Sequence, residues 1–94
     1  MAELTRDLLI QNELGLHARA AAQLVNLAGK HKPDLHLRRE DLEVNGKSIM
    51  GVLMLAAAKG TTVTARAVGE DEAALRNLLD EIERLVNNKF GEGK

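Results

Sequence analysis

A histidine and an arginine lie together where the sequence predicts that a loop becomes a helix. His17 follows Gly15-Leu16 and opens an alanine-rich stretch, and Arg19 lies two residues further on. The first amides of a helix lack intrahelical partners and carry the positive end of its dipole, which favours an anion by about 0.3 to 1 kcal/mol. The Ala18 amide and the Arg19 guanidinium would both donate to that anion. These groups predict a phosphate position around an imidazole.

Histidine also has suitable chemistry for phosphoryl transfer. Its unperturbed pKa of about 6.5 leaves a neutral, nucleophilic ring nitrogen near pH ~7, so His17 could accept a phosphoryl group. A purely structural role, as the residue that begins the helix, remains open at this point. No histidine or carboxylate spacing matches a zinc or calcium site, so we predict neither a metal nor any other cofactor.

Ser48 is the second residue with two interpretations. It precedes the apolar run at residues 49–58, which predicts a short helix ended by Lys59-Gly60. An N-cap hydrogen bond, worth about 1 kcal/mol, is a sufficient role for this serine. A regulatory role is the alternative, because the residues after Ser48 are apolar and form a helix too short to be buried on every side.

Five residues are candidates for a docking surface. Exposed apolar side chains on a short helix suggest a place where partners bind, and methionine suits a surface that meets several partners. The predicted partner-binding residues are Ile49, Met50 and Leu53 after the serine, together with Ala22 and Gln23 on the helix that His17 begins.

Seven patterned segments must position these residues. Strand-like alternation is expected over residues 4–10, 35–38, 42–44 and 61–68, and helical periodicity over residues 17–28, 49–58 and 74–86. Each strand has one polar side and each helix one apolar stripe. The order βαββαβα therefore predicts an α+β fold, an open-faced sandwich of one four-stranded antiparallel sheet with three helices on one face.

Length and composition restrict the class of protein. The 94 residues suit one domain, which we place at residues 1–88, followed by a flexible tail at residues 89–94. Thirteen basic and 14 acidic residues balance, and aromatics make up 1 %, so nucleic acid is not an expected partner. Cysteine is absent, and no signal or membrane segment is recognisable. We expect a cytoplasmic monomer without membrane insertion.

Two motifs resemble one family, the HPr phosphocarriers of the bacterial phosphoenolpyruvate-dependent phosphotransferase system. Gly15-Leu16-His17-Ala18-Arg19 is similar to the family's phosphorylation site, and Lys47-Ser48-Ile49-Met50-Gly51-Val52 to its regulatory serine segment. The similarity continues through Ala58-Lys59-Gly60 and Gly69-Glu70-Asp71-Glu72. One departure is Ala20, where the family motif most often has proline, and another is Asn26, where a basic residue is frequent.

The resemblance implies a relay protein and not an independent enzyme. His17 would take a phosphoryl group on Nδ1 from enzyme I and pass it to IIA domains for sugar uptake, with Arg19 steadying the phosphoryl oxygens. Ser48 would be phosphorylated by the HPr kinase/phosphorylase, which adds about −1.5 to −2 charge beside the docking surface. The paralogous carrier of the nitrogen-related branch is an alternative, and a small ferredoxin-like binding module is a more distant one.

Overall fold

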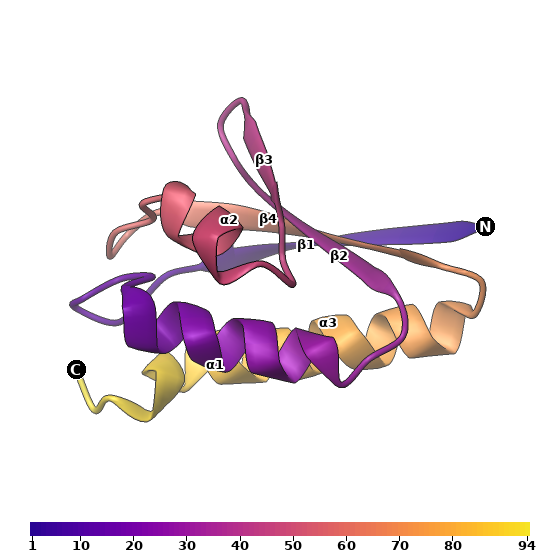
Figure 1. Cartoon of the computed structure of the whole chain (residues 1–94). Coiled ribbons are helices and arrows are strands. Elements are labelled where there is room, and N and C mark those ends of the chain that lie inside the picture. The colour runs from indigo at the N-terminus through magenta and orange to yellow at the C-terminus, as the bar shows by residue number, and fades with distance from the viewer.

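The four strands form one antiparallel sheet in this computed structural model, which describes all 94 residues. The strands are β1 (Ala2–Leu9), β2 (Asp34–Arg39), β3 (Leu42–Asn45) and β4 (Thr62–Gly69). Their spatial order is β1-β4-β2-β3, so the last strand in the chain is inserted between the first two (Figure 1). Ala65 in β4 is paired with Arg6 on one side and with Leu37 on the other.

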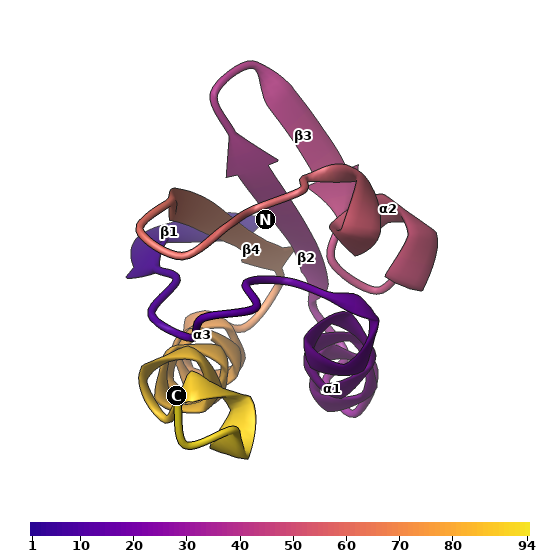
Figure 2. The same cartoon turned by 90° about the vertical axis from the view of Figure 1, so that its left-hand side faces the viewer.

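Three helices cover one face of this sheet and leave the other open. They are α1 (Ala18–Gly29), α2 (Ile49–Met54) and α3 (Glu72–Asn87). Figure 2 looks along α1 and α3, which lie side by side beneath the sheet, while the short α2 lies beside β2 and β3. The predicted open-faced βαββαβα sandwich is confirmed.

A single hydrophobic core lies between the sheet and the helices. The central strand contributes Val63, Ala65 and Ala67, whose small side chains let the helices approach closely. In α3, the buried residues recur at helical spacing, and Asp71 caps the helix by accepting the Ala73 N–H at 3.0 Å. No helix is both long and apolar enough to cross a membrane.

The helix expected over residues 49–58 is shorter in the structure. It ends at Met54, and Ala56 adopts a left-handed backbone with φ of 48°. Two long-range hydrogen bonds replace further helical ones: Arg39 Nε donates to the Leu55 carbonyl at 2.7 Å, and Leu16 N–H donates to the Ala57 carbonyl at 2.9 Å. These tertiary contacts override the helix propensity of the three alanines.

Residues 89–94, which we expect from the sequence to be a flexible tail, have a defined conformation in the structure. The chain forms a 3₁₀ turn, η1 (Lys89–Gly91), and Phe90, the only aromatic residue, is buried in the common core. Beyond it the chain returns toward the start of α1, where the Lys94 carbonyl accepts the Glu13 N–H at 3.2 Å. Phe90 therefore packs into the domain and Glu92 is half-buried against it, whereas Gly91, Gly93 and Lys94 are exposed.

Replacing Phe90 with alanine tests this packing. Removing a buried aromatic ring leaves a cavity and typically costs about 3 to 5 kcal/mol, so Phe90→Ala should lower the free energy of unfolding by about 3 kcal/mol in urea titrations. Met50, which is 71 % exposed, provides the control: Met50→Ala should change it by less than about 0.5 kcal/mol. Equal stability of the wild type and Phe90→Ala would show that the tail is not anchored.

Candidate functional site

His17 lies at the junction between a tightly fixed loop and α1. It is the N-cap residue, with extended backbone angles, and its carbonyl accepts the first intrahelical bond from Ala21 N–H at 2.8 Å. Gly15 in the loop has φ of +65°, and a Cβ there would lie 2.4 Å from the Ala57 carbonyl oxygen. Only glycine fits this contact, which sets the direction in which the chain enters the helix.

The two ring nitrogens of His17 face different partners. Nδ1 points to the helix and accepts the Arg19 N–H at 3.4 Å, whereas Nε2 lies 2.5 Å from a carboxylate oxygen of Glu92. An ionised carboxylate only accepts hydrogen bonds, so these partners assign the proton to Nε2 and the lone pair to Nδ1. The ring nitrogen that carries the lone pair is therefore the one beside the first-turn amides of α1.

Glu92 is fixed by a second donor on its other oxygen. Asn12 Nδ2 donates to Glu92 Oε1 at 3.0 Å and to the Gly15 carbonyl at 2.8 Å. The hydrogen bond from His17, and then that from Asn12, lowers the pKa of Glu92 below its ordinary value, although burial opposes part of the shift. The charge of Arg19 adds to the lowering.

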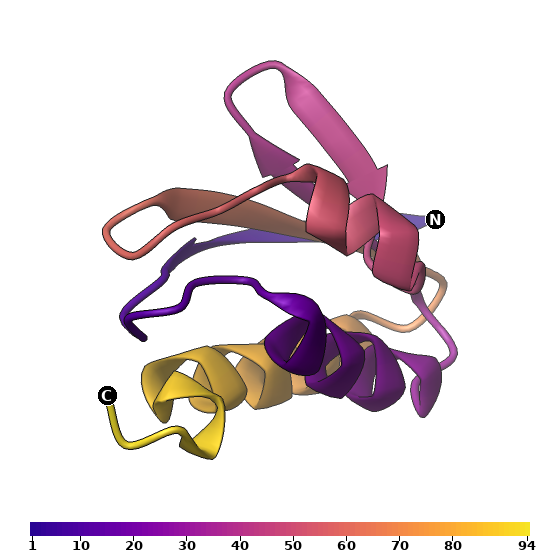
Figure 3. The same ribbon diagram turned by 60° about the vertical axis from the view of Figure 1, so that its left-hand side comes forward.

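These groups line one shallow pocket at the start of α1. Its walls are Leu14, His17, Arg19, Phe90, Gly91 and Glu92. Figure 3 shows how the C-terminal turn comes to lie below the loop that leads into α1. Arg19 is exposed and its guanidinium has no ion-pair partner, so it is available to an anion held beside Nδ1.

Sequence analysis missed three residues of this site, Glu92, Asn12 and Leu14. Glu92 had an indirect signal, because the only aromatic residue of the chain lies two positions before it and an aromatic side chain is usually buried. Asn12 is fully buried, and Leu14 is 69 % exposed at the rim of the pocket. Neither position stands out in the sequence.

Ser48 caps α2 as the sequence predicts. Its Oγ accepts the Gly51 N–H at 3.1 Å, and the serine is half-buried. Ile49 and Met50, which follow it, are exposed, whereas Leu53 is partly buried against the core.

The other two predicted partner-binding residues, Ala22 and Gln23, are half-buried on α1. α1 and α2 contact each other, which brings the two groups of predicted partner-binding residues onto neighbouring elements. One further residue of α2, Met54, is also exposed and was not predicted.

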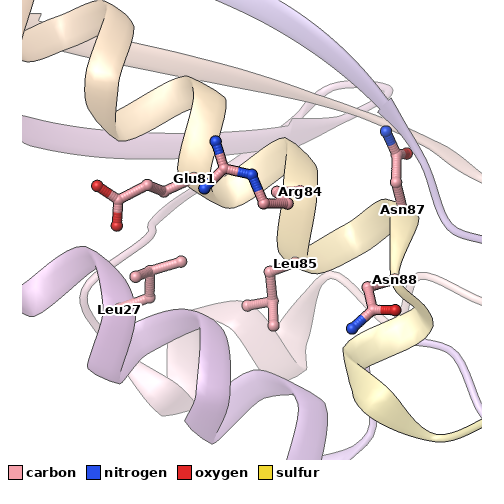
Figure 4. Close-up of a pocket in the computed structure, with 6 residues that line it drawn as sticks. All are labelled: Leu27, Glu81, Arg84, Leu85, Asn87 and Asn88. Atoms are coloured by element: carbon pink, nitrogen blue, oxygen red, sulfur yellow. The ribbon is translucent and has the colours of Figure 1, made fainter.

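A larger hollow lies between α1 and α3, apart from His17. Four of its six lining residues are polar, and Leu27 and Leu85 are the apolar ones (Figure 4). It contains none of the predicted site residues. No group of three or more His, Cys, Asp or Glu side chains in the structure could hold a metal ion.

Comparison with known proteins identifies the family of the chain. A family model described as the PTS HPr component phosphorylation site matches residues 4–88. Phosphocarrier protein HPr of Cupriavidus necator is 47 % identical over 91 residues, which cover 97 % of this chain and 99 % of the relative. The chain belongs to the HPr family. Its members are phosphocarrier proteins of the phosphotransferase system.

Solved structures of this family share the fold. HPr from Bacillus anthracis superposes with a TM-score of 0.83 at 29 % identity, covering 92 % of this chain and 99 % of that one. HPr-C-His from Thermoanaerobacter tengcongensis gives 0.76 at 39 % identity, with 98 % of both chains covered. The residues matched by the HPr family model stop at 88, so Glu92 lies beyond them.

The lowered pKa of Glu92 makes its contribution to stability depend on pH. A depressed carboxyl pKa stabilises the fold above the unfolded-state value of about 4.5, and this stability is lost as the pH falls through the lower folded-state value. Glu92→Gln should therefore be less stable than the wild type near pH ~6, and the difference should shrink below pH ~4. Urea unfolding at both pH values measures it.

The exposed Glu70 is a control for this experiment, since its side chain is 88 % accessible and makes only a 3.9 Å contact with the N-terminus. Glu70→Gln should be close to the wild type at both pH values. A Glu92→Gln difference that does not change with pH would contradict the ionised contact.

Proposed function

We propose that this protein accepts a phosphoryl group on Nδ1 of His17 from enzyme I and passes it to IIA domains for sugar uptake. One observation carries the proposal: the ring nitrogen with the lone pair faces the start of α1, because Glu92 accepts a hydrogen bond from the other nitrogen. Membership of the HPr family supports it. The protein acts as a relay, whose phosphorylated form is the product of one reaction and the donor for the next.

The transfer needs a nucleophile and a place for the charge of the phosphoryl oxygens. The Nδ1 lone pair forms the new N–P bond while the bond between phosphorus and the donor breaks, and its electron pair leaves with the donor. The amides of Ala18 and Arg19 and the guanidinium of Arg19 then stabilise the oxygens. The Arg19 N–H is already directed at Nδ1, at 3.4 Å, and would exchange that weak bond for a phosphoryl oxygen.

Partners would bind beside the histidine, over α1 and α2. Ile49, Met50 and Leu53 supply the apolar part of this docking surface, and Ala22 and Gln23 extend it on α1. Enzyme I and IIA domains use it in turn, which requires brief contacts and a monomeric, cytoplasmic carrier. The pocket at His17 opens to the surface of the protein, which suits a site that a partner protein covers.

Ser48 is the proposed regulatory position, phosphorylated by the HPr kinase/phosphorylase. The added charge would lie next to Ile49 and Met50, both exposed, and would oppose partners that bind an apolar surface. The segment from Lys47 to Val52 also favours the sugar branch, or a carrier that serves both branches, over a carrier of the nitrogen branch alone. A small ferredoxin-like binding module is ruled out by the family assignment.

Phosphorylation of His17 can be measured by intact mass. Incubation with phosphoenolpyruvate and enzyme I should add one acid-labile phosphoryl group, which His17→Ala lacks and the control His31→Ala keeps. The labelled carrier should then lose the group to purified sugar-branch IIA domains faster than to nitrogen-branch ones. No mass gain under conditions that label a known HPr would overturn the proposal.

A pair of Ser48 variants separates charge from capping. Asparagine and aspartate both cap helices well, so Ser48→Asn and Ser48→Asp should fold with similar stability. Only the aspartate adds a negative charge, and it should slow phosphorylation of His17 by enzyme I several-fold. The kinase with ATP should add an acid-stable phosphate to the wild type and none to Ser48→Ala; an unmodified wild type would leave Ser48 with only its capping role.

A further inference from the structure

Glu92 reaches His17 through a C-terminal segment with unusual backbone geometry. Lys89 and Phe90 both have positive φ, 53° and 54°, a conformation that side-chain-bearing residues rarely adopt and that costs free energy. Burial of the Phe90 ring offsets that cost and fixes the turn. Gly91 and Gly93, with φ of 75° and 78°, continue the reversal on either side of the glutamate.

The glutamate that this segment delivers is more tightly held than a surface carboxylate. Its side chain is only 13 % exposed, against 28 % for the imidazole that it contacts. The donors are His17 Nε2 on one oxygen and Asn12 Nδ2 on the other. Because Asn12 also holds the Gly15 carbonyl, the carboxylate is connected to the loop that positions the histidine.

We propose that Glu92 is a positioning residue for phosphoryl transfer: it engages Nε2 of His17, orients the ring so that Nδ1 faces the helix, and thereby directs the phosphoryl group to Nδ1. This inference rests on the proposed function of His17. It concerns a residue beyond the part of the chain that the HPr family model matches, residues 4–88. The carboxylate lies on the Nε2 side of the ring and leaves Nδ1 open to a donor.

The carboxylate also balances charge during the transfer. When Nδ1 bonds to phosphorus and the donor's bond breaks, the ring keeps its Nε2 proton and becomes cationic. Glu92, already hydrogen-bonded to that proton, gains a charge–charge attraction with no proton transfer. The same carboxylate oxygen thus orients the neutral ring before the transfer and stabilises the positive charge of the ring after it. Carboxylates have both roles in histidine–carboxylate pairs of other sites.

A second histidine–glutamate pair in the chain offers a matched control. His31 Nε2, in the turn that follows α1, lies 3.2 Å from Glu81 Oε1 in α3. Glu92→Ala should reduce the maximal rate of phosphorylation by enzyme I about 10-fold, with the half-saturating carrier concentration unchanged, since docking residues are untouched. Glu92→Gln keeps an acceptor oxygen without the charge, so its maximal rate should lie between those of the wild type and Glu92→Ala. The maximal rate of Glu81→Ala should equal that of the wild type. Equal or faster labelling of Glu92→Ala would overturn the inference.

A small donor separates this inference from the proposed function. Phosphoramidate transfers its phosphoryl group to imidazole nitrogen and releases ammonia, so it needs no protein partner. The wild type and Glu81→Ala should be labelled at Nδ1 of His17, whereas Glu92→Ala should also be labelled at Nε2, which ³¹P and ¹⁵N NMR distinguish. The same distribution in all three proteins would overturn the inference even if enzyme I labels His17. Failure of enzyme I alone, with the distributions as expected, would overturn only the proposed function.

Discussion

Leu16 can lead the chain into α1 only because the backbone at residue 15 lies directly against Ala57. The contact needs a residue without a side chain, since a Cβ would come 2.4 Å from the carbonyl oxygen. The Leu16 N–H bond to that same carbonyl then holds the loop in place. This pair of contacts both stops α2 and aims the histidine, so the segment that contains Ser48 and the segment that contains His17 are fixed by one backbone junction.

At the site, the two ring nitrogens of His17 lie in different surroundings. On one side are backbone amides at the positive end of α1, and on the other a carboxylate held by a buried asparagine. Neither side is a deep pocket, and the imidazole remains 28 % exposed. A relay requires this combination, because the ring must be oriented in the free protein and still reachable by each partner in turn.

Local signals in the sequence predict the elements well, and they fail where distant segments meet. The helix cap at Ser48, the amphipathic stripe of α3 and the strand-like alternation of β2 and β3 all depend on neighbouring residues, and the structure has each of them. The end of α2 was mispredicted because its decisive partners are Arg39 and Leu16, which no local pattern connects to it.

The candidate site follows the same division. The helix-start position of His17 and the presence of Arg19 are readable from the motif, since both depend on adjacent residues. The contact between His17 and Glu92 joins positions 75 residues apart in the sequence. Asn12 is fully buried, which its polar side chain does not predict. The packing of Phe90, which makes this long-range contact possible, is the feature that a composition with one aromatic residue could have indicated.

The return of the C-terminal segment to His17 places the two ends of the chain in very different surroundings. Met1 lies at the end of the molecule opposite the last residue, and it is 90 % exposed (Figure 1). A purification tag or fusion partner attached after Lys94 would emerge near the segment that holds Glu92 against the His17 imidazole. A tag attached before Met1 would lie at the other end of the molecule and leave the surroundings of His17 unchanged. The terminus that carries the tag should therefore affect any assay of His17 in this protein.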